Sequence, residues 1–227
     1  MVLTFFFFSF FTVAMGMVAK TARDAYFLSR FDKSILPLMF LAVAIFIAPI
    51  LTYYTMLSKK LAPRVLFPMT CAIFAGSLLL AQPMITGFVI PVVYIWVEVV
   101  VGIMLIQFWT FAGDSFEPQQ AKRLFSIIAG GGSFAVMIIG MNLKPFVNAF
   151  GTDELLFLAA GFLGLAAFFG LTAMQYFKKE PAKKGVVKPA KKEKTKKKQK
   201  RDPFIVGIGT IIALSAVVTT LVDYQFK

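Results

Sequence analysis

Charged side chains at the end of the first apolar segment are the residues best placed for binding chemistry. Lys20, Arg23 and Asp24 are spaced so that, on a continuing helix, both cations share one side and Lys20 pairs with Asp24. Two fixed cations beside one acid suit a polyanion, and Arg can grip phosphate through two parallel hydrogen bonds. Equally, the same residues could be anchors whose charged heads reach the membrane interface.

Glu98 is the acid that lies deepest inside a long hydrophobic run. Its side chain is too short to reach water easily, so we expect it to face other helices and to pair with Lys20 or Arg23. The pair would then be either a substrate-binding and gating element or a structural ion pair. Trp109 follows eleven residues later, which returns to nearly the same helix face.

Weaker candidates for substrate binding are Trp109, Asn142 and Asp223. Gln107 and Asn142 are expected to form hydrogen bonds between helices. Asp223 belongs to the charged segment 223–227, which is either a second charged cluster or a loose end.

Runs of glycine are interpreted as helix-packing surfaces. The segment 130–133 reads Gly-Gly-Gly-Ser but lacks the Lys of a phosphate-binding loop and lies in an apolar segment. Small residues let helix backbones approach closely, so we expect close packing there and at Gly161, Gly164 and Gly170.

Several kinds of chemistry are excluded or disfavoured by composition. The chain has no His and one Cys, so His-based metal sites, His general bases and intrachain disulfides are excluded. Cys71 lies in an apolar run and is expected to be a small buried hydrophobic residue. We therefore expect no enzyme activity, no metal and no cofactor.

Seven apolar segments have the length and composition of membrane-spanning helices. Hydrophobic residues make up 59% of the chain, and its mean hydropathy is +0.79. The segments are long enough to cross a bilayer core, and only helices satisfy their backbone groups within lipid. The positive charge near residue 20 follows the first apolar segment instead of preceding it, so that segment is a span and not a signal peptide. The predicted spans are 2–19, 35–57, 65–81, 88–112, 124–143, 155–177 and 204–222.

Positive charge is concentrated in one linker, 178–202, which holds 13 of the 24 Lys and Arg residues. Its Lys-, Pro- and Ala-rich sequence is typical of disorder, and the rest of the chain offers no basic surface for nucleic acid. Loops after the second, fourth and sixth spans are richer in cations than the others, which favours a cytoplasmic N-terminus and linker. The linker either holds this topology or binds anionic lipids.

Domain organisation therefore reads as a six-helix bundle over 1–177, the linker, and a seventh helix within 203–227. Six spans, a long basic linker and a new span is how six-plus-six transporters join their halves. The predicted fold is an all-α membrane protein, with a major-facilitator-like half bundle and one further helix, and the second half would be a missing partner.

Three stretches of the sequence resemble the bacterial and plastid ATP/ADP translocases. They are 20–31 (KTARDAYFLSRF), 108–125 (FWTFAGD, then Glu117 and AKRLF), and 223–227 (DYQFK). The resemblance implies twelve helices with alternating access in a bacterial inner membrane, and exchange of ATP for ADP. It also implies that Arg23 takes the place of the family's phosphate-binding Lys, Lys20 that of the preceding Arg, and that Glu98 lies near an essential Glu. The alternatives are a permease for a non-nucleotide solute and a truncated membrane protein without transport activity.

Overall fold

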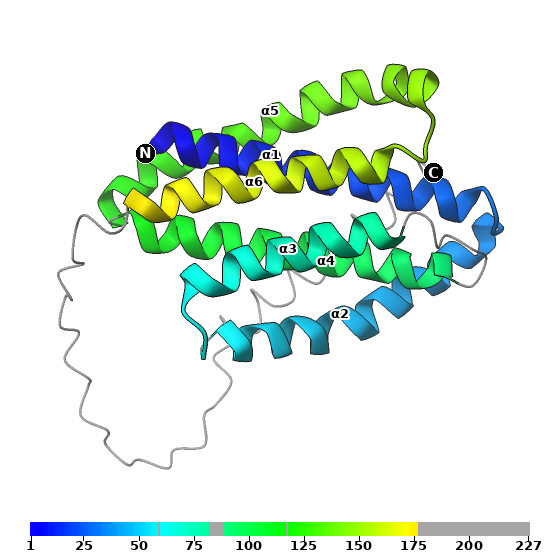
Figure 1. Ribbon diagram of the computed structural model, residues 1–227, viewed down its shortest axis with the longest axis horizontal. Coiled ribbons are helices and arrows are strands. Elements are labelled where there is room, and N and C mark those ends of the chain that lie inside the picture. Colours follow the sequence, from blue (N-terminus) through cyan, green and yellow to red (C-terminus); the bar gives the residue numbers. More distant parts are fainter. Residues whose placement is uncertain (59, 82–88, 117, 177–227) are drawn as a thin grey trace, which may run out of the picture. The chain divides into compact units, whose positions relative to one another are not determined.

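The computed structural model describes residues 1–58, 60–81, 89–116 and 118–176. The linker 178–202, the predicted span 204–222 and Asp223 lie outside the described residues. Within the described part, every regular element is a helix (Figure 1). The elements are α1 (Val2–Leu28), the short 3₁₀ helix η1 (Lys33–Ile35), α2 (Leu36–Ser58), α3 (Pro63–Ala81), α4 (Val89–Ser115), α5 (Pro118–Phe150) and α6 (Leu155–Tyr176).

All six α-helices are long and apolar enough to cross a membrane. They coincide with the first six predicted spans, which supports a multi-pass, all-α membrane protein. Continuous apolar segments adopt helices because each backbone group then finds its partner within the segment.

Three predicted breaks were placed too widely. One is the break between the predicted spans 88–112 and 124–143, since α4 continues to Ser115 and α5 begins at Pro118. Helix α1 does not end near residue 19 but continues to Leu28, so Lys20, Arg23 and Asp24 are helical residues and not loop residues. Helix α5 continues to Phe150 and contains Pro145, although the sequence suggested a break from residue 144. The chain turns only at Gly151, whose φ of +88° suits glycine and whose N–H bonds the carbonyl of Val147.

The remaining turns follow ordinary capping chemistry. Pro63 and Pro118 open α3 and α5, where the missing N–H of proline is harmless. Asp32 caps η1 by accepting a hydrogen bond from the N–H of Ser34 at 2.9 Å. That bond holds the pKa of the Asp32 carboxyl below its usual range.

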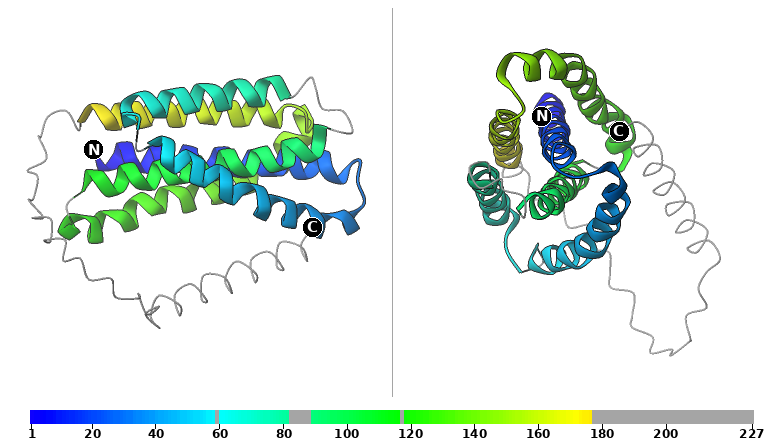
Figure 2. Two further views of the ribbon diagram at one scale, coloured as in Figure 1. Left: turned by 90° about the horizontal axis from the view of Figure 1, so that it is seen from below. Right: turned by 90° about the vertical axis from the view of Figure 1, so that its right-hand side faces the viewer.

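Helix α1 forms the centre of the bundle and packs against α4, α5 and α6 (Figure 2). Helix α4 also packs against α2 and α3, and α3 packs against α6. Aromatic rings fill the centre: Phe8 of α1 lies 5.6 Å from Phe67 and 5.1 Å from Phe108, between ring centroids. In contrast, α2 and α5 keep much of their apolar surface exposed.

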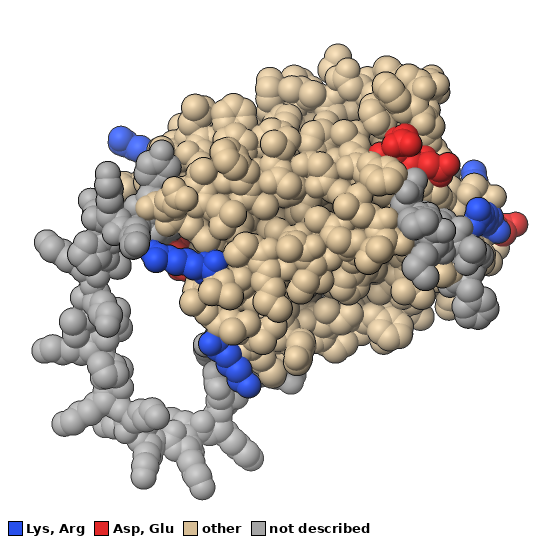
Figure 3. All heavy atoms as spheres, in the orientation of Figure 1, with Lys and Arg blue, Asp and Glu red and all other residues tan. Residues whose placement is uncertain are grey.

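Charge is distributed unequally between the two ends of this bundle (Figure 3). The end with the α2–α3 and α4–α5 connections is the more basic. Its described charged residues are Lys60, Arg64, Asp114 and Arg123, whereas those of the opposite end are Arg30, Asp32, Lys33, Lys144, Asp153 and Glu154. Because Lys20 and Arg23 belong to α1, the loop that follows α1 keeps only two cations, Arg30 and Lys33.

Candidate functional site

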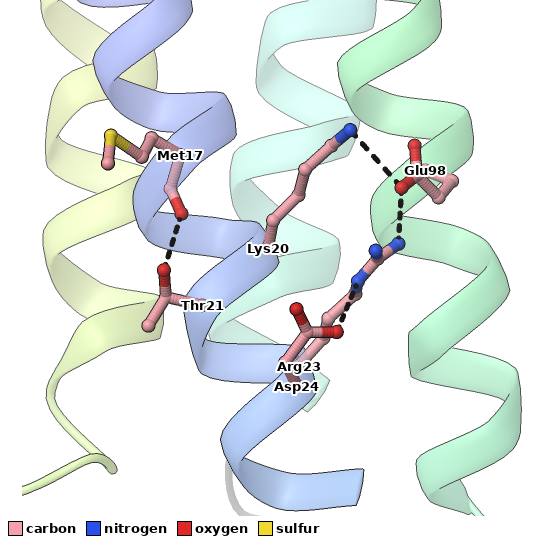
Figure 4. A network of polar contacts seen from close by, with 6 residues as sticks. All are labelled: Met17, Lys20, Thr21, Arg23, Asp24 and Glu98. Atoms are coloured by element: carbon pink, nitrogen blue, oxygen red, sulfur yellow. Dashed lines mark hydrogen bonds and ion pairs between the residues drawn. The ribbon is translucent and has the colours of Figure 1, made fainter. Parts of the chain in front are cut away.

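A four-residue ion-pair cluster joins the two central helices. Lys20 and Arg23 reach from α1 toward one carboxylate oxygen of Glu98 on α4 (Figure 4). The distances to Glu98 Oε1 are 3.2 Å from Lys20 Nζ and 2.6 Å from Arg23 Nη1. The predicted pairing of Glu98 with these cations is therefore present, and both cations contribute.

Arg23 is the buried member of the cluster. Its side chain is 4% exposed, and its Nε donates to Asp24 Oδ1 at 3.3 Å. Its guanidinium carbon lies 4.1 Å from the centre of the ring of Tyr94 on α4, which is a cation–π contact. Its Nη1 forms an ion pair with Glu98 Oε1 at 2.6 Å. Three groups thus hold this guanidinium in one position.

Lys20 and Glu98 form the accessible side of the cluster. The side chain of Lys20 is 42% exposed and that of Glu98 is 20% exposed. The expected pairing of Lys20 with Asp24 along the helix is not among the ion pairs of the described residues, because Lys20 turns to Glu98 and Asp24 pairs with Arg23. A ligand can therefore reach Lys20 without displacing Arg23.

Formal charge in the cluster is balanced by two cations and two carboxylates. Balance matters because an unpaired charge among apolar helices is unfavourable. An entering anion could replace the Glu98 carboxylate as the partner of Lys20, so the cluster can exchange an internal carboxylate for an external one.

The weaker candidates do not join this cluster. Trp109 is half-exposed, packs against Phe108 and Phe125, and lines a separate cavity between α1, α4 and α5. Asn142 is exposed and its side-chain amide donates to the carbonyl of Ile138 in its own helix at 2.8 Å. The expectation of an interhelical bond from Asn142 is therefore wrong, since α5 turns this residue away from its neighbours.

Gln107 fulfils the expectation of an interhelical hydrogen bond. It is buried, and its amide nitrogen donates to the Tyr54 hydroxyl at 2.6 Å and to the Thr70 hydroxyl at 2.7 Å. These bonds join α4 to α2 and α3. Cys71, beside this network, is 4% exposed in the core, as its apolar surroundings indicated.

Glycine packing is confirmed in some positions and wrong in others. A Cβ at Gly131 would collide with the carbonyl oxygen of Phe6, and one at Gly170 would collide with the Phe67 ring, so both allow close helix contact. A Cβ at Gly130 on α5 would meet nothing within 4 Å, and the same holds at Gly161 and Gly164, which are exposed on α6. Their position on the helix surface, which a single sequence does not reveal, explains the wrong expectation.

The sequence analysis did not identify three residues that lie at the ion-pair cluster or line the neighbouring cavity. Tyr94 lies four residues before Glu98 and so shares its helix face, a spacing that could have identified it. Ser9 and Thr12, which line the cavity beside Trp109, looked like unremarkable polar residues in a Phe-rich segment. Within the described part of the chain, no three His, Cys, Asp or Glu side chains converge to hold a metal ion.

Comparison of the chain with protein-family models, curated proteins and solved structures finds no match. The function must therefore be argued from the cluster and its surroundings, and the family resemblance stays a prediction.

Proposed function

We propose that this chain is part of a secondary transporter that exchanges nucleotides of the ATP/ADP type, or a related organic anion, by alternating access. The observation that carries the proposal is the meeting of Lys20 and Arg23 with Glu98 between two apolar helices. Intramembrane charges that remain partly accessible are characteristic of substrate and ion pathways.

The packing pattern supports a major-facilitator-like half bundle. Such halves contain two three-helix repeats of inverted topology. Exchanging α1 with α4, α2 with α5, and α3 with α6 maps each packed helix pair onto another packed pair: α1–α5 maps onto α4–α2, and α1–α6 maps onto α4–α3. The correspondence is unequal in extent, since α4 packs far less against α3 than α1 does against α6. Under this exchange the two helices that carry the cluster, α1 and α4, are equivalent.

In the proposed mechanism, Glu98 is the counter-ion of the empty site. A phosphate group would take over the exposed cation Lys20, while Arg23 remains fixed by Asp24 and Tyr94. As the Glu98 carboxylate moves away, the Arg23 guanidinium donates two parallel hydrogen bonds to the phosphate. Because the empty site is charge-balanced, it leaves no cation unpaired until the next anion arrives.

The charge of the loops supports an orientation. We propose that the more basic end of the bundle, where α1 begins and α6 ends, faces the cytoplasm of a bacterial inner membrane. The N-terminus and the linker 178–202 would then be cytoplasmic, as the sequence predicts. The removal of Lys20 and Arg23 from the opposite loop strengthens this asymmetry.

Binding of ADP and pyrophosphate to the purified chain tests the proposal, together with uptake of labelled ATP by cells that express the gene. We expect Lys20→Gln to weaken both ligands about tenfold, which corresponds to one lost charge-assisted hydrogen bond. Arg23→Gln should weaken them further. Arg123→Gln, an exposed cation at the end of the bundle, is the matched control and should bind as the unmodified chain does.

Binding that is unchanged in both Lys20→Gln and Arg23→Gln would refute the assigned site. If neither phosphate ligand binds while a non-phosphorylated solute stabilises the chain, a permease for another solute replaces nucleotide exchange. A truncated membrane protein without transport activity would neither bind nor take up any solute in these assays.

A further inference from the structure

A cavity between α2, α3 and α4 lies at the end of the bundle where α2 and α4 end and α3 begins (Figure 1). Its volume of about 210 Å³ corresponds to about seven water-sized groups of ~30 Å³ each, and pockets for drug-sized ligands are larger. Asp114, which lines it, follows Glu98 by sixteen residues on α4, or ~24 Å along the helix. A small ligand here would therefore bind apart from the ion-pair cluster.

Polar side chains on two apolar helices line this cavity. Gln107, Thr110 and Asp114 share one face of α4, because they are three and four residues apart. Tyr54 and Ser58, four residues apart, share one face of α2. Ser58 is half-buried, whereas Thr110 and Asp114 are exposed, so a ligand in the cavity can reach all three side chains.

The three accessible side chains offer hydrogen-bond acceptors. The Thr110 hydroxyl donates to the carbonyl of Ile106 at 2.7 Å, and the Ser58 hydroxyl donates to the carbonyl of Thr55 at 2.9 Å. Each hydroxyl has thereby used its one hydrogen and keeps lone pairs for a ligand. The Asp114 carboxylate only accepts, and it makes no ion pair among the described residues. These groups suit a ligand that donates hydrogen bonds and carries positive charge.

The remaining wall is apolar and favours an organic cation over a metal ion. It contains Leu66, Phe67, Ile106 and Phe111, and the two Phe rings make an edge contact with centroids 5.2 Å apart. A hard metal ion needs oxygen ligands on most sides, which this wall does not supply. An alkyl chain packs on such a wall, and the aromatic faces attract the cation that the chain carries. An anion would find no Lys or Arg among the described residues that line the cavity.

From these observations we propose that the cavity binds a small organic cation with a primary ammonium group, taken from the aqueous phase at this end of the bundle. The three N–H donors of the ammonium match the acceptors on Ser58, Thr110 and Asp114, and its charge balances the single carboxylate. The alkyl chain lies against Phe67 and Phe111. This site adds a second class of ligand and does not depend on anion exchange.

Thermal unfolding of the purified chain tests the proposal, with n-butylammonium as the probe. The amine replaces potassium chloride at constant ionic strength, so that screening of surface charges does not change. We expect the unfolding temperature to rise with amine concentration, because a ligand that binds only the folded chain stabilises it. Butan-1-ol, which has the chain without the charge, should not raise it.

Two substitutions in the cavity locate the binding. Asp114→Asn should weaken n-butylammonium about tenfold and Thr110→Val about fivefold, each through one lost charge-assisted hydrogen bond. Asp153→Asn, an exposed acid at the opposite end, is the control for the first. Thr52→Val is the control for the second, since the Thr52 hydroxyl donates to the carbonyl of Ala48 on α2 and Thr52 does not line the cavity. Both controls should bind the amine as the unmodified chain does.

Several outcomes would overturn the amine site. These are no stabilisation by n-butylammonium, equal stabilisation by butan-1-ol, and unchanged amine affinity in both cavity variants. Stabilisation only by micelles that contain phosphatidylethanolamine would assign the cavity to a lipid headgroup instead. ADP binding, measured on the same variants, should be unchanged, so the amine site and the anion site stand or fall separately.

Discussion

The two ion pairs that share Glu98 should differ strongly in strength. Arg23 is 4% exposed and lies 2.6 Å from the carboxylate oxygen, whereas Lys20 is 42% exposed and lies 3.2 Å away. An effective dielectric constant near 20 for the buried pair corresponds to a coulombic attraction of ~6 kcal/mol, and a water-like value for the exposed pair to ~1 kcal/mol. Desolvation reduces both figures.

We therefore predict a double-mutant-cycle coupling of about 2–3 kcal/mol for Arg23 with Glu98 and below about 1 kcal/mol for Lys20 with Glu98. The substitutions are Glu98→Gln, Arg23→Gln and Lys20→Gln, singly and in pairs. Glu98→Gln alone should destabilise the chain by about 3 kcal/mol, because it leaves the guanidinium without its main counter-ion.

Unfolding in mixed detergent micelles, followed by circular dichroism, measures these free energies. Asp114→Asn is the matched control, since it makes the same chemical change at the exposed end of α4 and should alter stability by less than about 0.5 kcal/mol. Equal couplings for the two cations would refute the argument that burial decides the strength of the pair. A coupling free energy near zero between Arg23 and Glu98 would mean that Asp24 and Tyr94 alone keep the guanidinium in position.

Other predictions concern packing and topology. Gly131→Ala should destabilise the chain by about 1–3 kcal/mol, because the added methyl group meets the α1 backbone. Gly130→Ala, whose methyl group faces open space, should not destabilise it. The free energy of unfolding in detergent distinguishes the two variants. Gln107→Leu should cost about 1–2 kcal/mol in the same assay, because two hydroxyl groups on α2 and α3 lose their shared donor, and unchanged stability would show that the network is dispensable. In a cysteine-free background, Lys33→Cys should react with an impermeant maleimide in intact cells and Arg64→Cys only after permeabilisation; the reverse pattern would invert the proposed orientation.

Much of the fold follows from the sequence because lipid leaves few choices. Long apolar segments must be helical, and all six described helices coincide with predicted spans. Their ends were harder to predict, since a helix can carry charge and proline beyond its apolar core, as α1 does through Arg23 and α5 through Pro145.

In the candidate site, only the contacts that are required by the cost of an unpaired intramembrane charge could be predicted from the sequence. A deep acid requires a cation, so the pairing of Glu98 with Lys20 and Arg23 could be anticipated. Which face each helix turns to its neighbours depends on packing over the whole bundle, and a single sequence shows only one helix at a time. That explains why Asn142 was assigned an interhelical bond, and why the cavity at Thr12 was not anticipated.

The length of α1 and α4 determines where a bound anion would sit in the membrane potential. Each helix has 27 residues and is about 40 Å long, so an upright, centred helix extends roughly 5 Å past each side of a ~30 Å hydrocarbon core. Lys20, eight residues from the end of α1, and Glu98, nine residues from the start of α4, then lie at matching depths of ~8 Å below the same surface. An anion entering from that surface crosses about a quarter of the field, or ~0.6 kcal/mol per negative charge per 100 mV. Under the proposed function, the affinity of this cluster for an anion would thus depend on voltage, by about e-fold per charge per 100 mV, before any helix moves.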